Sequence, residues 1–119
     1  MSIFALALLS ACGGNVDNET ADKYITKAQD IVTLLNDGKY GEVTQTFNSE
    51  MKAGLPESEL MKLEPVIQES GEFETFDKAS VEEKDGHFVV VLVANYSEDK
   101  RIYTISFNQE SEVAGFFIK

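Results

Sequence analysis

The residues that could do chemistry are few and stand far apart. The chain has one histidine and one cysteine among 119 residues. His87 directly follows Asp85 and Gly86, a strong signal for a tight turn between two strands, where a side chain ordinarily faces water. One histidine and one cysteine provide neither a nucleophile paired with a base nor a set of metal ligands at a usual spacing. Glu82 and Glu83 beside the turn are more typical of a solvated edge than of a calcium site. We therefore expect no catalytic residues, no metal and no cofactor.

Cys12 points to a covalent lipid anchor instead. A short apolar run ends in the tetrad Leu9, Ser10, Ala11, Cys12, which resembles the lipobox of bacterial lipoproteins. There the thiol accepts a diacylglycerol and the chain is cut before the cysteine, and two acyl chains hold a protein stably on a membrane. We expect a signal peptide over residues 1–11, a lipidated tether over 12–19 and one domain over 20–119. The location expected is the extracytoplasmic face of a bacterial cell membrane.

One feature of the N-terminal segment departs from this expectation. The first eleven residues contain no lysine or arginine, whereas a signal peptide begins with positive charge; a signal peptide truncated at its start would explain the departure. The alternative is a buried free cysteine on an N-terminal strand.

The net charge of −11 and the scattered basic residues disfavour nucleic acid as a partner, because no basic patch is present to neutralise phosphates.

Helical patterns occupy the first half of the chain. Apolar side chains recur at helical spacing over Thr20–Asn36, and Gly38 is placed for the left-handed residue beyond a helix end. A shorter helix begins at Tyr40, and a loop follows it. A third helix is expected over Pro56–Ser70, where Pro65 should kink it or divide it into two pieces.

Strand patterns occupy the second half. His87–Tyr96 is an almost unbroken apolar run and should lie in the middle of a sheet. Strands are expected at Phe73–Lys84, His87–Tyr96, Lys100–Phe107 and Glu112–Ile118. The turn signals and the alternation of side chains predict three directly opposed pairs: Ala79 with Leu92, Ala94 with Tyr103, and Tyr103 with Phe116. The fold class is therefore α+β, with N-terminal helices packed on a curved four-stranded antiparallel meander.

One face of this sheet should receive the helices, and a curved sheet over one helix often leaves a cavity at its wide end. Small residues there fit either a pocket or close packing. Asp77 interrupts the apolar face, as a general base, as an anchor for a polar ligand group, or at a bulge that turns it outward. The expected ligand is a small amphipathic molecule with a hydroxyl or cationic end. The candidate ligand-binding residues are Tyr24, Ala28, Asp77, Ala94, Tyr103 and Phe116.

The opposite face carries an apolar stripe among serines and threonines, with Val113 expected on it as well. Such a stripe on an uncovered sheet suggests a protein partner, and a homodimer is one possibility. The alternative is that these side chains are screened by long neighbours and face water. The candidate interface residues are Val89, Val91, Val93, Ile102 and Phe117.

Several short motifs resemble a known family. They are Leu35 to Tyr40 with Val43 and Phe47, then Met51, Lys52, Leu55 and Pro56, then Gly71 to Phe73, and finally Val113 to Phe116. In this order they are similar to the domain of unknown function 3887 family. The resemblance implies a nuclear transport factor 2-like cone in bacterial surface lipoproteins or beside hydrolase domains. It implies no catalytic residues.

Three functions are compatible with these observations. The leading hypothesis is a non-catalytic, lipid-anchored domain of the cell envelope that binds a small ligand or a protein partner. The first alternative is an enzyme of the isomerase or hydratase kind with Asp77 as its base. The second is a purely structural dimerisation module. Because one fold can host all three, the residues of a site must decide between them.

Overall fold

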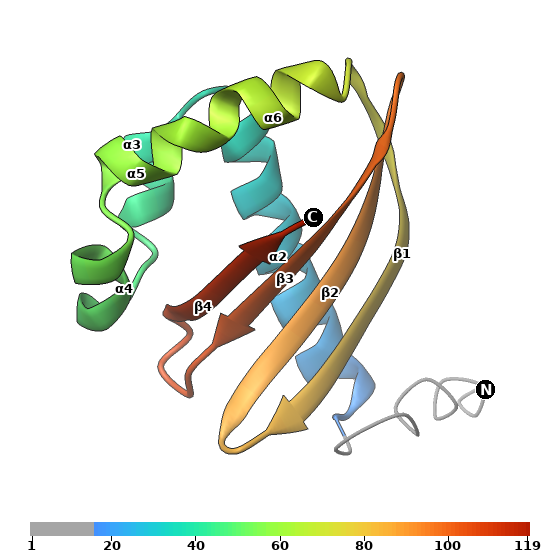
Figure 1. Cartoon of the computed structure of the whole chain (residues 1–119). Coiled ribbons are helices and arrows are strands. Elements are labelled where there is room, and N and C mark those ends of the chain that lie inside the picture. Colours follow the sequence, from blue (N-terminus) through green and yellow to red (C-terminus); the bar gives the residue numbers. More distant parts are fainter. Residues whose placement is uncertain (1–15) are drawn as a thin grey trace.

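The structure, a computed structural model, describes residues 16–119 and is an α+β domain (Figure 1). The expected signal peptide over residues 1–11 and Cys12 at the start of the expected tether lie outside the described residues. The helical elements are α2 (Asn18–Asn36), α3 (Tyr40–Thr44), α4 (Ser49–Gly54), α5 (Glu57–Leu60), the 3-10 turn η1 (Met61–Leu63) and α6 (Glu64–Glu69). The strands are β1 (Phe73–Lys84), β2 (His87–Tyr96), β3 (Lys100–Phe107) and β4 (Val113–Ile118).

Helix α2 forms where the apolar spacing predicts it and turns one stripe inward. Its buried residues recur every three or four positions: Tyr24, Ala28, Ile31, Val32 and Leu35. The helix ends at Asn36, and Gly38, two residues beyond, has a φ of +76°. The amide of Gly38 donates to the carbonyl of Leu35, and the next amide, from Lys39, donates to Leu34. These bonds satisfy carbonyls that would otherwise lack a partner at the end of the helix.

The segments after α3 differ in part from the prediction. The expected loop contains α4, because the Asn48 side chain accepts a hydrogen bond from the amide of Met51 at 2.8 Å and so caps a new helix. The expected break at Pro65 is confirmed, since α5, η1 and α6 are three short pieces and the proline lies in the first turn of α6. There the missing N–H of proline costs no hydrogen bond.

The four strands form one antiparallel sheet in the order β1-β2-β3-β4, as the meander prediction requires. Figure 1 shows the sheet curving around α2, with all the helices on one side of it. We call the face toward the helices the inner face and the opposite one the outer face. The core lies between α2 and the inner face, where Val90, Leu92 and Ile105 are fully buried.

The register between β1 and β2 is confirmed near their turn, where Ala79 lies opposite Leu92. The other two registers differ from prediction by two residues. Tyr103 lies opposite Leu92 instead of Ala94, and Ile118 instead of Phe116 lies opposite Tyr103. A shift of two keeps each of these side chains on its expected face, because side chains alternate with a period of two.

Candidate functional site

The expected ligand cavity is filled by side chains. Ala28, Ala94 and Tyr103 each expose 0% of their surface. A void able to hold a water molecule would leave accessible area on its walls, so no such void touches these three residues. Tyr24 is also buried, and its ring stacks on that of Phe88 with the centroids 4.5 Å apart. The prediction of a pocket walled by these residues is therefore wrong.

Phe116, the remaining apolar member of the predicted site, is half-buried and meets Tyr103 edge-on. Its ring centroid lies 6.4 Å from that of Tyr103. An edge-to-face arrangement at this separation is favourable packing between aromatic rings. Phe116 therefore closes the core beside Tyr103 and does not line an opening.

Asp77 lies at a bulge and is exposed. The register of β1 shifts between Phe76 and Lys78, which lie opposite Ala94 and Val93 respectively. Phe76 thus takes the inner position predicted for Asp77, because its ring packs against the core where a carboxylate would lose its hydration. The bulge that the sequence left open as one alternative for Asp77 is therefore confirmed. Its carboxylate is exposed, whereas the predicted partners Tyr24, Ala28, Ala94 and Tyr103 are buried in the core, so its role as an anchor within a pocket is wrong.

A buried polar cluster that the sequence patterns did not predict lies at the end of the sheet. The hydroxyl of Tyr96 donates to the side-chain oxygen of Asn36 at 2.6 Å and lies 2.7 Å from the hydroxyl of Tyr103. Burial raises the pKa of both tyrosines above 10.0, and most strongly that of Tyr103. The hydrogen bonds satisfy these hydroxyls inside the core, so the cluster holds the end of α2 against β2 and β3.

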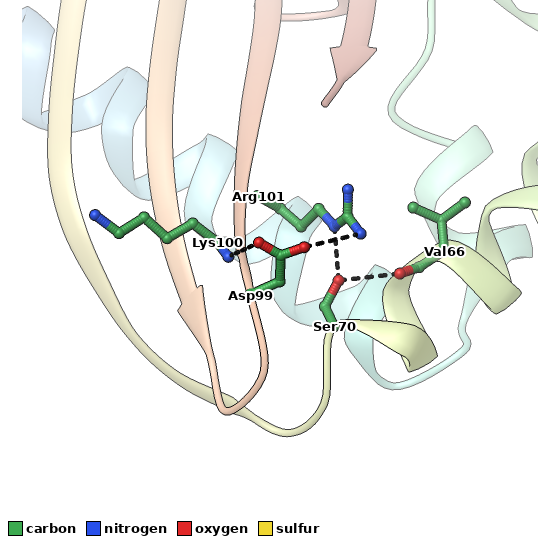
Figure 2. A network of polar contacts seen from close by, with 5 residues as sticks. All are labelled: Val66, Ser70, Asp99, Lys100 and Arg101. Carbon is green, nitrogen blue, oxygen red and sulfur yellow. Dashed lines mark hydrogen bonds and ion pairs between the residues drawn. The ribbon is translucent and has the colours of Figure 1, made fainter.

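A second network joins α6 to β3 (Figure 2). The Nε of Arg101 donates to the Oγ of Ser70 at 2.6 Å, and that hydroxyl donates to the carbonyl of Val66 at 3.0 Å. A carboxylate oxygen of Asp99 lies 3.7 Å from the guanidinium group of Arg101. The signal for this network was the alternation of β3, which places Arg101 on the inner face and so requires a polar partner there.

Both networks have a structural role. Every hydroxyl in them has a partner, and the Arg101 side chain is only 19% exposed. Among the described residues, no group of three or more His, Cys, Asp or Glu side chains is placed to hold a metal ion. His87 faces the Asp85 carbonyl of its own turn at 3.1 Å. The arrangement therefore offers structural hydrogen bonds at the end of the sheet and no assembled acid, base or nucleophile in the part described.

The outer face is the surface that no helix covers. Val89, Val91, Val93 and Ile102 are half-buried on it, and Phe117 is 73% exposed. The structure thus brings all five predicted interface residues onto one face.

Val113 does not join them and is fully buried. A register shift in β4 leaves Ala114 as the extra residue and turns Val113 inward. There Val113 exchanges hydrogen bonds with the segment before α4, since its amide donates to Thr46 and its carbonyl accepts from the amide of Asn48. Its expected place on the outer face is corrected.

A shallow hollow lies on the outer face beside β1. It has a volume of about 430 Å³ and is lined by Lys78, Ala79, Ser80, Val91 and Val93. Its walls combine the side chains of two valines, Ser80 and Lys78 with the backbone at Ala79, whose own side chain lies on the inner face. Phe117 stands on the same face two strands away from β2. The outer face therefore has a projecting aromatic ring at one edge and a depression at the other.

Comparison with known proteins agrees with this architecture. A nuclear magnetic resonance structure of a protein from Ruminococcus gnavus ATCC 29149 is similar to 86% of this chain and 90% of its own, with a TM-score of 0.69 and 21% sequence identity. At this identity the likeness establishes the fold alone. Residues 28–116 match the model of the family described as protein of unknown function (DUF3887). The chain belongs to this family, as its motifs predict. No curated protein matches the sequence, and no helix in residues 16–119 is long and apolar enough to span a membrane.

Proposed function

We propose that this domain is a non-catalytic lipoprotein module of the bacterial cell envelope that binds a protein partner through the outer face of its sheet. The observation that carries the proposal is the uncovered apolar stripe, above all Phe117 at 73% exposure. Apolar side chains gathered on one face are typical of a protein interaction surface, whereas a single exposed one needs no explanation.

The interior supports binding at the surface over binding inside the cone. Ala94 and Tyr103 have no accessible surface and leave no room for a substrate. The isomerase or hydratase alternative required Asp77 as a base within a pocket, but Asp77 is exposed at the bulge. The nuclear transport factor 2-like cone remains our interpretation of the curved sheet with helices on its inner face.

The start of the described chain supports close attachment to a membrane. Val16 is buried, with 6% exposed, beside the first turn of α2. Four residues, from Cys12 to Asn15, precede it, and four extended residues span at most ~14 Å. A lipid on Cys12 would therefore keep the domain near the bilayer surface. There, binding to another membrane-associated protein benefits from a high effective concentration.

A photo-crosslinking experiment tests the surface. A photoreactive phenylalanine analogue is placed at Lys78, at the rim of the hollow, in the full chain expressed in bacteria with its signal. The matched control carries the analogue at Lys52, an exposed lysine on α4. We expect a protein adduct from position 78 and none from position 52. Equal yields at the two positions, or none at 78, would exclude the outer face as the binding surface.

The lipid anchor is tested separately. The full chain should partition into the detergent phase, and Cys12→Ser should move it to the aqueous phase, because the thiol is the acceptor of the lipid. A Cys12→Ser chain that stays with the membrane would show that the apolar N-terminal run holds the protein by another means.

A further inference from the structure

The outer face carries shapes that complement each other on one and the same molecule. The register of the sheet aligns four outward residues in a row across its strands: Ser80 on β1, Val91 on β2, Thr104 on β3 and Phe117 on β4. The row rises from a small side chain beside the hollow to a large exposed ring at the opposite edge. Gly115, in the neighbouring row, leaves the surface low beside Ser106.

We propose that the partner of the outer face is a second copy of this chain, bound so that Phe117 of each copy enters the hollow beside Ser80 of the other. The proposal rests on the proposed function, since it names the partner of the same surface. The twofold axis that relates the two copies lies between their stacked sheets. It runs parallel to the strands, over the boundary between β2 and β3, and so places β1 of each copy against β4 of the other. Phe117 then faces Ser80, Val91 faces Thr104, and Val93 faces Ile102.

Side-chain volumes favour this axis. Two sheets stacked face to face lie about 10 Å apart and interdigitate at the density of a protein core. Pairing the largest side chain of the row with the smallest keeps that spacing even across all four strands. A twofold axis across the strands would instead set Phe117 against Phe117 and Ser80 against Ser80. That arrangement would crowd one edge of the interface and leave a gap at the other.

The size of the face predicts a weak dimer. Four strands at ~4.8 Å and three rows at ~7 Å cover about 20 Å by 20 Å on each copy, or roughly 800 Å² for the pair, which is below the range of stable complexes. The net charge of −11 on each chain also opposes association. Lys78 faces Lys119 of the second copy at the rim, where water and salt screen the two ammonium groups. Anchoring both copies in one membrane would favour association, because confinement to a surface raises their effective concentration.

Sedimentation equilibrium tests the second copy. The full chain carrying Cys12→Ser, which removes the only thiol, is studied up to about 1 mM, where a weak dimer with a dissociation constant in that range forms. The mass should rise with concentration from 13.2 kDa toward twice that value. Added salt should strengthen the association by screening the repulsion between the two acidic chains.

Exchanging the large and small side chains tests the geometry. Phe117→Ser should weaken dimerisation about tenfold by removing the ring, and Ser80→Phe should do the same by filling the hollow. The double variant exchanges the knob and the hollow and should restore the affinity to within about threefold. Met61→Ser is the matched control, since Met61 is 46% exposed on the helical side. Phe117 and Ser80 are both exposed, so unchanged melting temperatures check that each variant remains folded.

The outcomes separate this inference from the proposed function. A single species of 13.2 kDa at every concentration, with an adduct at Lys78 to a different protein, would overturn the second copy and leave the binding surface standing. Association that survives both single variants, or a double variant no better than the single ones, would overturn the pairing of Phe117 with Ser80. No adduct at Lys78 would remove the proposed function itself.

Discussion

Arg101 on β3 donates from Nε to the Oγ of Ser70, 2.6 Å away, just beyond the end of α6. Ser70 is fully buried, and its hydroxyl donates a hydrogen bond to the carbonyl of Val66. The cation thus lies at the negative end of a helix, where its charge is favourable. One buried hydroxyl connects the helical half of the chain to the sheet.

Ser70→Ala should lower the free energy of unfolding by about 1 to 3 kcal/mol, because it leaves the Nε of Arg101 without its acceptor in a largely buried site. Urea unfolding gives the value. Adding Arg101→Met to Ser70→Ala should recover part of the loss, since removing both polar partners costs less than leaving one unpaired. If the two single losses simply add in the double variant, the hydrogen bond contributes nothing to the coupling of α6 and β3.

Gly71→Ala should be one of the most damaging small substitutions. Gly71 has a φ of +92°, and a methyl group there would overlap the Oγ of Ser97 and lie 3.0 Å from the backbone nitrogen of Glu98. The left-handed backbone alone costs roughly 1 kcal/mol, and the overlap brings the expected loss to about 2 kcal/mol or more.

A second glycine provides the control for Gly71→Ala. Gly54→Ala on α4 meets nothing within 4 Å, so it should be neutral or stabilising by about 0.5 to 1 kcal/mol, because alanine favours helix. Thermal denaturation of both variants makes the comparison. Equal melting temperatures would mean that the turn at Gly71 tolerates a side chain.

The sequence predicted the register best where a local signal determines it. Asp85 and Gly86 both have positive φ, 53° and 79°, as a two-residue hairpin requires. The pairing of Ala79 with Leu92 follows directly from that turn. The spacing of apolar residues likewise predicted α2, because one stripe of the helix is buried.

The register was wrong where distant contacts determine it. The turn between β2 and β3 is centred one residue earlier than expected, on Ser97 and Glu98, which shifts the pairing of the two strands by two residues. It lies there because the amides of Ser97 and Glu98 donate to the carbonyls of Glu72 and Ser70. No local pattern in β2 or β3 contains this information. The same holds for β4, whose bulge at Ala114 follows from the hydrogen bonds between Val113 and the segment before α4.

The candidate site could likewise be predicted from the sequence only in part. The alternation of side chains predicted the outer stripe, including Phe117, since alternation alone assigns a residue to a face. The pocket was not predictable, because Ala28 and Ala94 suit close packing and an open cavity equally well. Only the assembled packing, with both alanines at 0% exposure, distinguishes the two.

Ala94→Phe should destabilise the domain severely. Ala94 has no accessible surface, so the larger ring must displace core side chains, and we expect a loss of about 3 kcal/mol or more. Asp77→Ala is the control in the same region and should change the free energy of unfolding by no more than about 0.5 kcal/mol, because Asp77 is exposed. A melting temperature for Ala94→Phe close to that of the unmodified protein would show that space for a ligand exists beside Ala94.

Alkaline pH should unfold the domain through its buried tyrosines. Burial raises the pKa of Tyr40, Tyr96 and Tyr103 above the ordinary 10.0, and the Glu64 carboxylate adds to the effect at Tyr40. The folded state therefore holds these protons more tightly than the unfolded state does. Their contribution to stability is complete below pH 10.0 and is lost as the pH rises from there toward the folded pKa values.

The measurement is the free energy of unfolding against pH, with tyrosinate absorbance followed in the same samples. Each tyrosine with a raised pKa makes the free energy of unfolding fall more steeply above pH 10, by up to about 1.4 kcal/mol per pH unit. Tyr103→Phe keeps the buried ring and removes one ionisable group, so it should make the fall shallower by up to that amount. The absorbance of the buried tyrosines should rise together with unfolding. A full tyrosinate signal near pH 10 from a protein that remains folded would contradict the buried hydroxyl pair of Tyr96 and Tyr103.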